Sequence, residues 1–418
     1  MSSKNDYEVR YEAIQLHEAG IGFNDVLRTV HRSCFWLTKW LRRFREHGLA
    51  GLCDQSRAPK HVRNRTRKSL VRKILALRDE LAAHKSRRAA FAGIGAETIH
   101  FELQRRGIRR LPAISTIEKI LARAGKTKKV KGQRLAGGPP YPHIRARRMG
   151  DLQQTDLVGP RYLRGPRGVT RFYSFHTVDV VGQTASAGQF SDKQTISLCS
   201  HLLDSWRFMG LPRVSQMDNE MSASGGGRYR YSLSQVIRLH LLLGIHLLFI
   251  PPGEPGRNAA VESFKGLWQK RVLFHTCLNL RTLRRTSNRF LRYYHLQKPS
   301  RSLTLADHGT RFPGVLRDRT WPTLRHLPDG FSLDPYIDTR GHLALPVAKG
   351  HVSFVRKVDS HGCIEFNGAE YFIRRKLERQ YVVATLSTHY RRVFIKSEGK
   401  LIKSVPFPFT GTVNDPLV

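Results

Sequence analysis

Residues 250–271 read IPPGEPGRNAAVESFKGLWQKR and change from an irregular loop into a helix. The prolines and glycines at the start of this stretch rule out regular structure, and Asn258 is a suitable N-cap for the helix that follows. Apolar side chains recur at helical spacing and should pack inward; they are Val261, Phe264, Trp268 and Val272. Glu262 stands in the first turn beside this apolar face. There a carboxylate can offset the helix dipole or hold a ligand.

Two aspartates occur in or just after expected strands. Asp156 lies in the stretch LQQTDLV, where β-favouring residues predict a strand that ends at Gly159-Pro160. Asp218 directly follows a second short strand, LPRVSQM. Aspartate is disfavoured inside strands, and a single one is usually a turn cap or an ion-pair partner. Three carboxylates at separate strand or helix ends favour a shared role.

An Asp in a first strand, an Asp-Asn after a later strand and a Pro-x-x-Asn-x-x-x-Glu helix follow one another in this chain. This order resembles the catalytic core of DDE transposases and retroviral-type integrases, and most of all bacterial insertion-sequence transposases. The resemblance covers nearly the whole chain. It implies that Asp156, Asp218 and Glu262 are the catalytic triad on a ribonuclease-H-like core, and that Asp179 is structural.

The chain departs from the family pattern at three positions. Glu220 stands where Gly usually follows the Asp-Asn pair, Ala259 stands where Gly usually follows the Asn of the helix, and Gln269 replaces a basic residue. Glu220 and Glu254 are the nearest rivals of Glu262 as the third ligand. We expect Glu262 to be preferred because its helix fixes it, whereas Glu254 belongs to a Pro-rich segment whose mobility would spoil a fixed ligand geometry.

The three carboxylates have a chemical consequence if they meet in the fold. Carboxylates held close together repel one another, so their joint ionisation needs a cation. Hard oxygen ligands that leave room for water and phosphate suit Mg²⁺ or Mn²⁺, and we expect two such ions. Two ions can activate a nucleophilic oxygen and stabilise the leaving oxygen in phosphodiester displacement. The expected activity is metal-dependent DNA strand cleavage and strand transfer, as in DNA integration and recombination.

Composition points to the partner. Lys and Arg number 72 against 32 Asp and Glu, which gives a net charge of +40. This excess predicts double-stranded DNA rather than a membrane surface, because no strongly amphipathic basic helix stands out. The five cysteines form no CxxC pair, which argues against zinc sites and disulfides. Without a signal peptide or a sufficiently long apolar run, we expect a bacterial cytoplasmic protein that is nucleoid-associated when bound to DNA.

The chain reads as a multidomain protein with all-α N-terminal units, an α/β core and a β-rich C-terminus. The expected domains are a helix-turn-helix unit at 1–52, a second helix-turn-helix or winged-helix-like unit at 66–125, a basic linker at 126–149, the mixed-sheet core at 150–297 and a small β-barrel at 329–400. Ser33 and Ser115 are expected N-caps. An ordinary helical bundle with a solvated basic face is the alternative for the first unit.

Basic and polar residues on the third helix, in the linker and on the Glu262 helix are expected to contact DNA. They are Thr38, Lys39, Arg42, Arg43, Lys128, Lys129, Lys131, Lys265 and Lys270. We expect a homo-oligomer that binds element ends and target DNA. Two alternatives remain: a catalytically impaired DNA-binding regulator derived from a transposase, which Glu220, Ala259 and Gln269 allow, and a structure-directed nuclease of the same fold.

Overall fold

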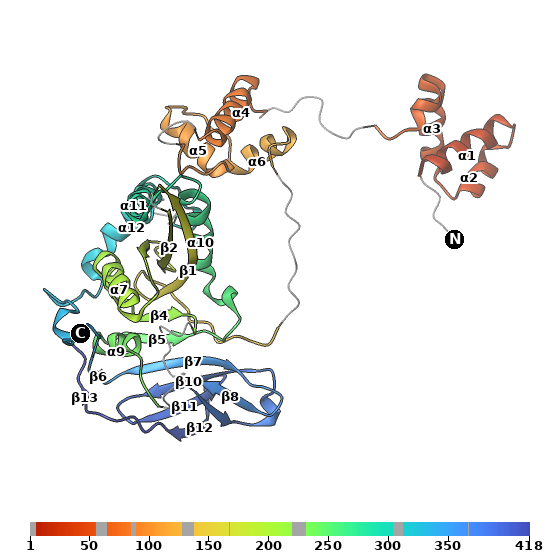
Figure 1. The fold of residues 1–418 in the computed structure, drawn as a ribbon. Coiled ribbons are helices and arrows are strands. Elements are labelled where there is room, and N and C mark those ends of the chain that lie inside the picture. Colours follow the sequence, from red (N-terminus) through yellow and green to blue (C-terminus); the bar gives the residue numbers. More distant parts are fainter. Residues whose placement is uncertain are drawn as a thin grey trace. The chain divides into compact units, whose positions relative to one another are not determined.

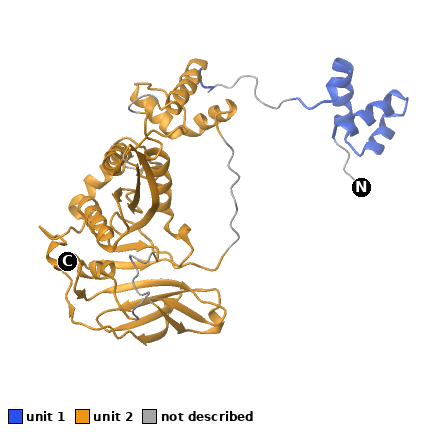
Figure 2. Cartoon of the chain, viewed as in Figure 1, with its two compact units in different colours: residues 1–67 blue, residues 68–418 orange. Residues whose placement is uncertain are grey.

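The computed structural model describes residues 6–55, 65–84, 89–127, 138–166, 168–219, 231–303, 312–366 and 368–418. The chain divides into two compact units, Met1–Arg67 and Lys68–Val418 (Figure 2). Within the described residues, no helix has the length and apolarity needed to span a bilayer.

The first unit contains the three short helices that the sequence predicts. They are α1 (Asp6–Glu18), α2 (Phe23–Val30) and α3 (Cys34–His47), followed by a 3₁₀ turn at Gly48–Leu52. Ser33 is the N-cap of α3, as expected, and its hydroxyl accepts a hydrogen bond of 3.3 Å from the Trp36 amide. The core between the helices contains Ile14, Leu37 and Trp40. The buried Arg10 closes the unit, because its guanidinium donates to the Leu52 carbonyl at 2.8 Å.

The second unit begins with three more helices, α4 (Lys68–Ala82), α5 (Ala96–Arg105) and α6 (Ile114–Arg123). Their core contains Ile74, Leu77, Ile99, Leu103, Ile117 and Leu121. The expectation that Ser115 caps α6 is wrong. The helix begins earlier because the Ala113 carbonyl already accepts the Thr116 and Ile117 amides, at 2.9 and 3.1 Å. This leaves Ser115 inside the first turn.

A nine-stranded mixed sheet organises the rest of this unit, in the order β12-β11-β10-β7-β5-β4-β1-β2-β3 (Figure 1). The five strands of the expected core are β1 (Leu152–Gly165), β2 (Gly168–Asp179), β3 (Ala185–Phe190), β4 (Val214–Met217) and β5 (His246–Phe249). The first three pair antiparallel, whereas β1, β4 and β5 run parallel. The predicted mixed sheet with flanking helices is therefore confirmed.

Strand β1 does not end at Gly159-Pro160, as the sequence suggested. Its pairing with β2 resumes at Arg161, after a register shift that follows Val158, and continues to Gly165. Proline has no amide hydrogen for a strand ladder, and the irregularity places it where none is required. The long strand therefore carries Asp156 in its middle rather than at its end.

Helices cover both faces of the core sheet. They are α7 (Thr195–Met209), α9 (Gln235–Leu242), α10 (Ala259–Val272), α11 (Leu280–Leu296) and α12 (Pro313–Thr320). Alternate residues of β2 separate the two layers: Phe175 packs in the cluster of α7 and α9, whereas Phe172 and Val178 pack in the cluster of α10 and α11. Trp268 joins α10 to α11, because its indole N–H donates to the Ser287 hydroxyl at 2.9 Å.

The C-terminal strands differ from the expected barrel. Strand β7 (His351–Lys357) pairs parallel with β5, with Leu247 opposite Val352 and Phe249 opposite Phe354. Strands β10 (Tyr381–Ser387), β11 (Arg392–Ser397) and β12 (Lys400–Pro406) then extend the same sheet. Two small pairs complete the region, β6 (Val347–Ala348) with β13 (Val413–Asn414) and β8 (Cys363–Phe366) with β9 (Ala369–Phe372). Among the described strands no pairing closes a ring, since the apolar edge of β5 takes β7 as its neighbour.

Candidate functional site

Asp156 and Asp218 stand on neighbouring parallel strands. In the pairing of β1 with β4, Thr155 lies opposite Met217, so the two aspartates are the next residues along each strand. Parallel strands share one direction, so the residues that follow this paired position lie beside each other, where the pairing of β1 with β4 ends. The Leu157 amide donates to Asp156 Oδ1 at 2.7 Å, which fixes that carboxylate on β1.

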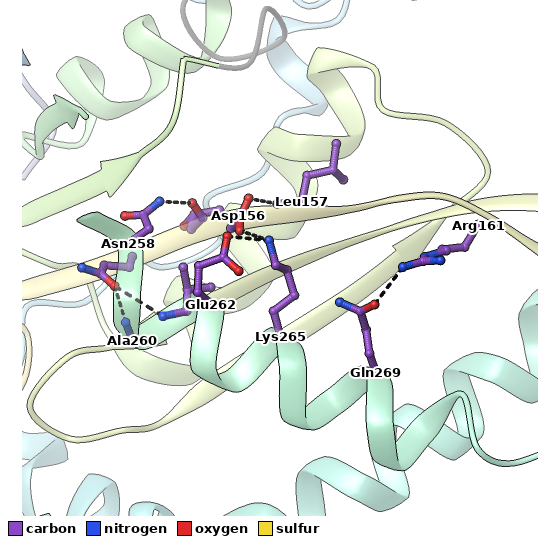
Figure 3. Close-up of polar contacts among 11 residues, drawn as sticks. Asp156, Leu157, Arg161, Asn258, Ala260, Glu262, Lys265 and Gln269 are labelled. Atoms are coloured by element: carbon purple, nitrogen blue, oxygen red, sulfur yellow. Dashed lines mark hydrogen bonds and ion pairs between the residues drawn. The ribbon is translucent and has the colours of Figure 1, made fainter. Parts of the chain in front are cut away.

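Glu262, in the first turn of α10, is joined to Asp156 by a shared cation (Figure 3). The Lys265 ammonium donates to Glu262 Oε1 at 2.7 Å and also to Asp156 Oδ2. The Lys265 side chain is only 17% exposed, and that of Asp156 only 9%. The structure therefore places Lys265 between two candidate ligands, although the sequence suggested that it meets a DNA phosphate.

Burial is the largest cause that raises the pKa of Glu262, and the hydrogen bond and charge of Asp156 add to it, against the opposing effect of Lys265. Burial lowers the pKa of Lys265, but its hydrogen bonds to both carboxylates outweigh burial, and the net pKa is raised. One ammonium cannot compensate two carboxylates, and the remaining repulsion falls on Glu262. The pair is consequently poised to accept further positive charge.

The start of α10 is held by a side chain of β1. Gln154 Oε1 accepts hydrogen bonds from the Ala260 amide at 3.0 Å and the Val261 amide at 3.3 Å. Asn258 was the expected cap, but its side chain makes no capping bond and instead donates to the Thr155 carbonyl at 3.3 Å. The expectation failed because a glutamine from another element satisfies the first amides of the helix.

Strand β4 contributes a matching glutamine. Gln216 Nε2 donates to the Arg257 carbonyl at 2.9 Å and to Asn258 Oδ1 at 2.8 Å. We call Gln154, Gln216 and Asn258 the amide cluster. Each glutamine precedes a candidate aspartate by two residues, in Gln-Thr-Asp on β1 and Gln-Met-Asp on β4. Residues two apart share a face of a strand, so the amide cluster ties the helix of Glu262 to both aspartate-bearing strands.

Strand β1 brings a cation beside Gln269 of α10. The Arg161 guanidinium donates to Gln269 Oε1 at 3.1 Å (Figure 3). Sequence reasoning missed Arg161, since only the register of β1 brings it beside α10. Lys270, an expected DNA contact, lies exposed on α10.

Glu254 is occupied elsewhere. Arg257 Nε lies 2.9 Å from its Oε2, and the Tyr381 hydroxyl of β10 lies 2.7 Å from its Oε1. Its carboxylate is fixed by these contacts, contrary to the expectation of a mobile segment. Glu220, the other rival of Glu262, lies outside the described residues.

Asp179 ends β2 as a buried carboxylate with three backbone donors. It accepts the Gly150 amide at 2.8 Å, the Val181 amide at 3.1 Å and the Gly182 amide at 2.6 Å. Burial raises the pKa of Asp179 to about 6, although the three backbone donors oppose that shift. Its oxygens tie together the turn after β2 and the residues before β1, a structural arrangement.

The expected DNA contacts of the first unit divide into two groups. Lys39 and Arg42 are exposed on α3, and the exposed Thr38 bonds back to the Cys34 carbonyl. Arg43 turns toward its own unit, where it donates to the Cys53 carbonyl at 2.9 Å and stacks 4.5 Å from the centre of the Trp40 ring. Lys128, Lys129 and Lys131 lie outside the described residues.

The oxygen atoms of Asp156, Asp218 and Glu262 decide whether a metal ion fits the candidate triad. In the described part of the chain, one group of His, Cys, Asp or Glu residues has all its ligand atoms within 4.8 Å of one another, and it consists of Asp359, Cys363 and Glu370. The ligand atoms of Asp156, Asp218 and Glu262 therefore do not all lie within 4.8 Å of one another. Two of them nevertheless hold an ammonium between them, and this group stands in for a metal cation. The donor set consequently fits a hard divalent ion.

No protein-family model and no curated protein matches this sequence. Solved structures similar to it include a simian T-cell lymphotropic virus intasome in complex with the PP2A regulatory subunit B56 gamma, at 16% identity and a TM-score of 0.32 over 74% of this chain and 92% of that one. The HTLV-2 integrase catalytic core with magnesium matches at 15% identity and a TM-score of 0.30, over 41% of this chain and 99% of that core. The BIV integrase catalytic core matches at 13% identity and a TM-score of 0.30, over 42% of this chain and 97% of that core.

Proposed function

We propose that this protein is a DNA transposase or integrase of the insertion-sequence type, which binds element ends and carries out strand cleavage and strand transfer. The observation that carries the proposal is the Lys265 ammonium shared by Asp156 and Glu262, beside the strand end that bears Asp218. The cation lies between two carboxylates, where two parallel strands meet a helix. Such an arrangement suits a metal-dependent reaction on a polyanion.

Asp156, Asp218 and Glu262 would hold two Mg²⁺ or Mn²⁺ ions. When bound, such ions supply Lewis acidity toward both the attacking and the leaving oxygen of a phosphodiester. The amide cluster orients Glu262 over the strands of both aspartates. Lys265, released from the carboxylates, reaches a phosphate oxygen from the same helix turn.

The reaction is a direct displacement at phosphorus. In end cleavage a water oxygen forms the new P–O bond and the 3′-oxygen of the element strand leaves with a proton. In strand transfer that freed 3′-hydroxyl attacks a target phosphodiester, and the target 3′-oxygen leaves. The net charge of +40 supports binding of the phosphate backbone, to which the exposed Lys39 and Arg42 of α3 contribute.

One observation favours a second candidate, a DNA-binding regulator that has lost the chemistry. The internal ammonium of Lys265 already bridges Asp156 and Glu262 and offsets part of their repulsion, so the fold can hold these two carboxylates together without a metal. Such a protein would bind element ends without cutting them. A structure-directed nuclease would instead hydrolyse DNA without joining it.

The test is joining of a labelled duplex, taken from the DNA that flanks the gene, to a plasmid in Mg²⁺ or Mn²⁺. Asp156→Asn, Asp218→Asn and Glu262→Gln should each lower joining at least about a hundredfold and leave duplex binding within about threefold. Asp329→Asn, at an exposed carboxylate away from these strands, is the matched control. Joining by the triad variants at the wild-type rate would refute the proposal, cleavage without joining would indicate the nuclease, and binding without cleavage the regulator.

A further inference from the structure

Helix α11 presents a row of exposed arginines. Arg281, Arg285, Arg289 and Arg292 recur every three or four residues and therefore share one face of the helix. The 17 residues of α11 include no Asp or Glu. Within the described residues none of these four side chains forms an ion pair. We call these four residues the arginine row.

This arrangement weakens the helix that carries it. Like charges four residues apart repel one another, as Arg281 does with Arg285 and Arg285 with Arg289. No acidic side chain on α11 offsets the repulsion. Since no ion pair to these four arginines is found in the described part of the chain, a bound anion would relieve the repulsion.

The arginine row borders a hollow of about 850 Å³ between α11 and the loop that precedes α5. Arg285, Arg289 and Arg292 line it together with Phe91. The Phe91 ring packs against Phe290 at a centroid distance of 5.8 Å, and the Arg289 guanidinium lies 5.9 Å from the Phe91 ring centre. The hollow therefore combines a basic wall with a fixed aromatic base where the α4–α6 helices meet the core.

The row has the length of a segment of nucleic-acid backbone. Arg281 and Arg292 are eleven positions apart along the helix, which corresponds to roughly 16 Å at 1.5 Å per residue. One DNA strand carries a phosphate about every 3.4 Å of helix axis, so the row spans about five of them. Guanidinium groups bind phosphate oxygens with two parallel hydrogen bonds, a geometry that a lysine cannot offer.

We propose that the arginine row is a backbone-binding surface for double-stranded DNA, with the duplex seated along α11 beside the α4–α6 helices. The inference rests on the proposed function only in taking DNA as the polyanion. Its contacts are to phosphates and so independent of sequence. The surface would hold a duplex on the core through contacts that are separate from the exposed residues of α3.

Full-length protein with Arg281→Gln, Arg285→Gln, Arg289→Gln and Arg292→Gln combined tests the surface. Fluorescence anisotropy would measure its affinity for a random 30-base-pair duplex at several KCl concentrations. We expect binding at least about tenfold weaker and a slope of log K against log salt that is smaller by about 0.9 for each lost phosphate contact. The matched control removes four exposed cations from the C-terminal half, with Arg340→Gln, Lys357→Gln, Lys396→Gln and Lys400→Gln. It should stay within about threefold of wild type with little change in slope.

Equal losses in both quadruple variants, or an unchanged salt slope in the arginine variant, would overturn the surface. A change of molecular mass by light scattering with unchanged DNA affinity would overturn it too, and would indicate a protein interface. The arginine variant should melt no lower than wild type without DNA, because the repulsion is gone. If it unfolds, Arg285→Gln alone should lower the slope by about one, and an unchanged slope refutes the proposal.

Joining by Asp156→Asn and DNA binding by the arginine variant test the proposed function and the arginine row separately. If Asp156→Asn abolishes joining while the arginine variant binds normally, the surface is wrong and the function stands. If Asp156→Asn joins normally while the arginine variant loses DNA, the function is wrong and the surface stands.

Discussion

At the residue level, Lys265 is the cation that links two of the candidate carboxylates. Its ammonium bonds to both Asp156 and Glu262, and it is the internal competitor of any divalent ion at these carboxylates. A cation that is covalently tethered to the helix needs no binding from solution, so Lys265 holds these two carboxylates together without a divalent ion. A divalent ion that binds here as proposed would have to displace it.

Lys265→Gln should therefore tighten Mn²⁺ binding by about five- to tenfold, because the competing charge is removed. Without metal, the same change should lower the free energy of unfolding by about 1–3 kcal/mol, since two half-buried carboxylates lose their common donor. Calorimetric titration with Mn²⁺ and thermal melting with and without the ion measure both effects. Lys270→Gln, on an exposed position of the same helix, is the control. Weaker Mn²⁺ binding would mean that Lys265 positions the carboxylates and does not compete with the ion.

Asp179→Asn should separate a structural carboxylate from those proposed to be catalytic. The pKa of Asp179, about 6 in the folded protein, lies above its ordinary value of 3.8. Between these values the folded state binds more protons than the unfolded state, so stability increases as the pH falls through this window. From pH 7 to pH 5 the wild type should gain about 1 kcal/mol relative to the variant, measured by urea unfolding. An equal pH dependence in both proteins would contradict the raised pKa.

At the scale of elements, the amide cluster fixes how α10 lies over β1 and β4. Its two glutamines occupy equivalent places before their aspartates, yet their hydrogen-bonding roles are opposite. Gln154 mainly accepts, since the one bond that it donates, to the Arg257 carbonyl, is long at 3.4 Å. In the described part of the chain, the Gln216 side chain donates to the Arg257 carbonyl and to Asn258 Oδ1. The chemistry of the two positions therefore differs although the residue is the same.

A carboxylate can replace an acceptor but not a donor. Gln154→Glu should keep the helix cap and change the Mg²⁺ concentration for half-maximal joining by less than about threefold. Gln216→Glu sets a carboxylate against two acceptor oxygens, and should raise that concentration at least about tenfold. Both variants add one negative charge near the site, so each is the control of the other. Equal effects would show that charge, and not positioning of α10, is what changed.

At the scale of the whole molecule, the sheet continues from the core into the C-terminal strands. Phe249 of β5 stacks on Phe354 of β7 with ring centres 5.1 Å apart, and Tyr381 of β10 holds Glu254 in the loop before α10. The C-terminal strands therefore belong to the structure that positions Glu262. They are not a separable domain in this fold.

A fragment of residues 138–303 should consequently fail to fold, although it contains the whole expected core. Removing β7 uncovers the apolar edge of β5, which invites aggregation. Gel filtration and circular dichroism of this fragment against residues 138–418 provide the comparison. Deletion of residues 1–67, which form their own compact unit, is the control and should leave the melting of the remainder unchanged. A monomeric, cooperatively melting 138–303 fragment would contradict this view.

The local elements could be predicted from the sequence. The N-terminal helices, helix α10 and strand β4 lie close to their expected positions, because apolar periodicity and turn residues act over a few neighbouring residues. It also pointed to Asp156 and Glu262, which the fold brings together, and to an Asp179 that fits a structural role.

How these elements combine depends on contacts between residues that are far apart in the sequence. Lys265 and Asp156 are separated by 109 positions, Arg161 and Gln269 by 108, and Gln154 and Ala260 by 106, so their contacts depend on strand register and helix docking. The pairing of β7 with β5 is likewise set by which apolar edge remains free once the sheet has formed. A local pattern cannot encode such a choice, because each partner alone has the same periodicity whichever neighbour it meets.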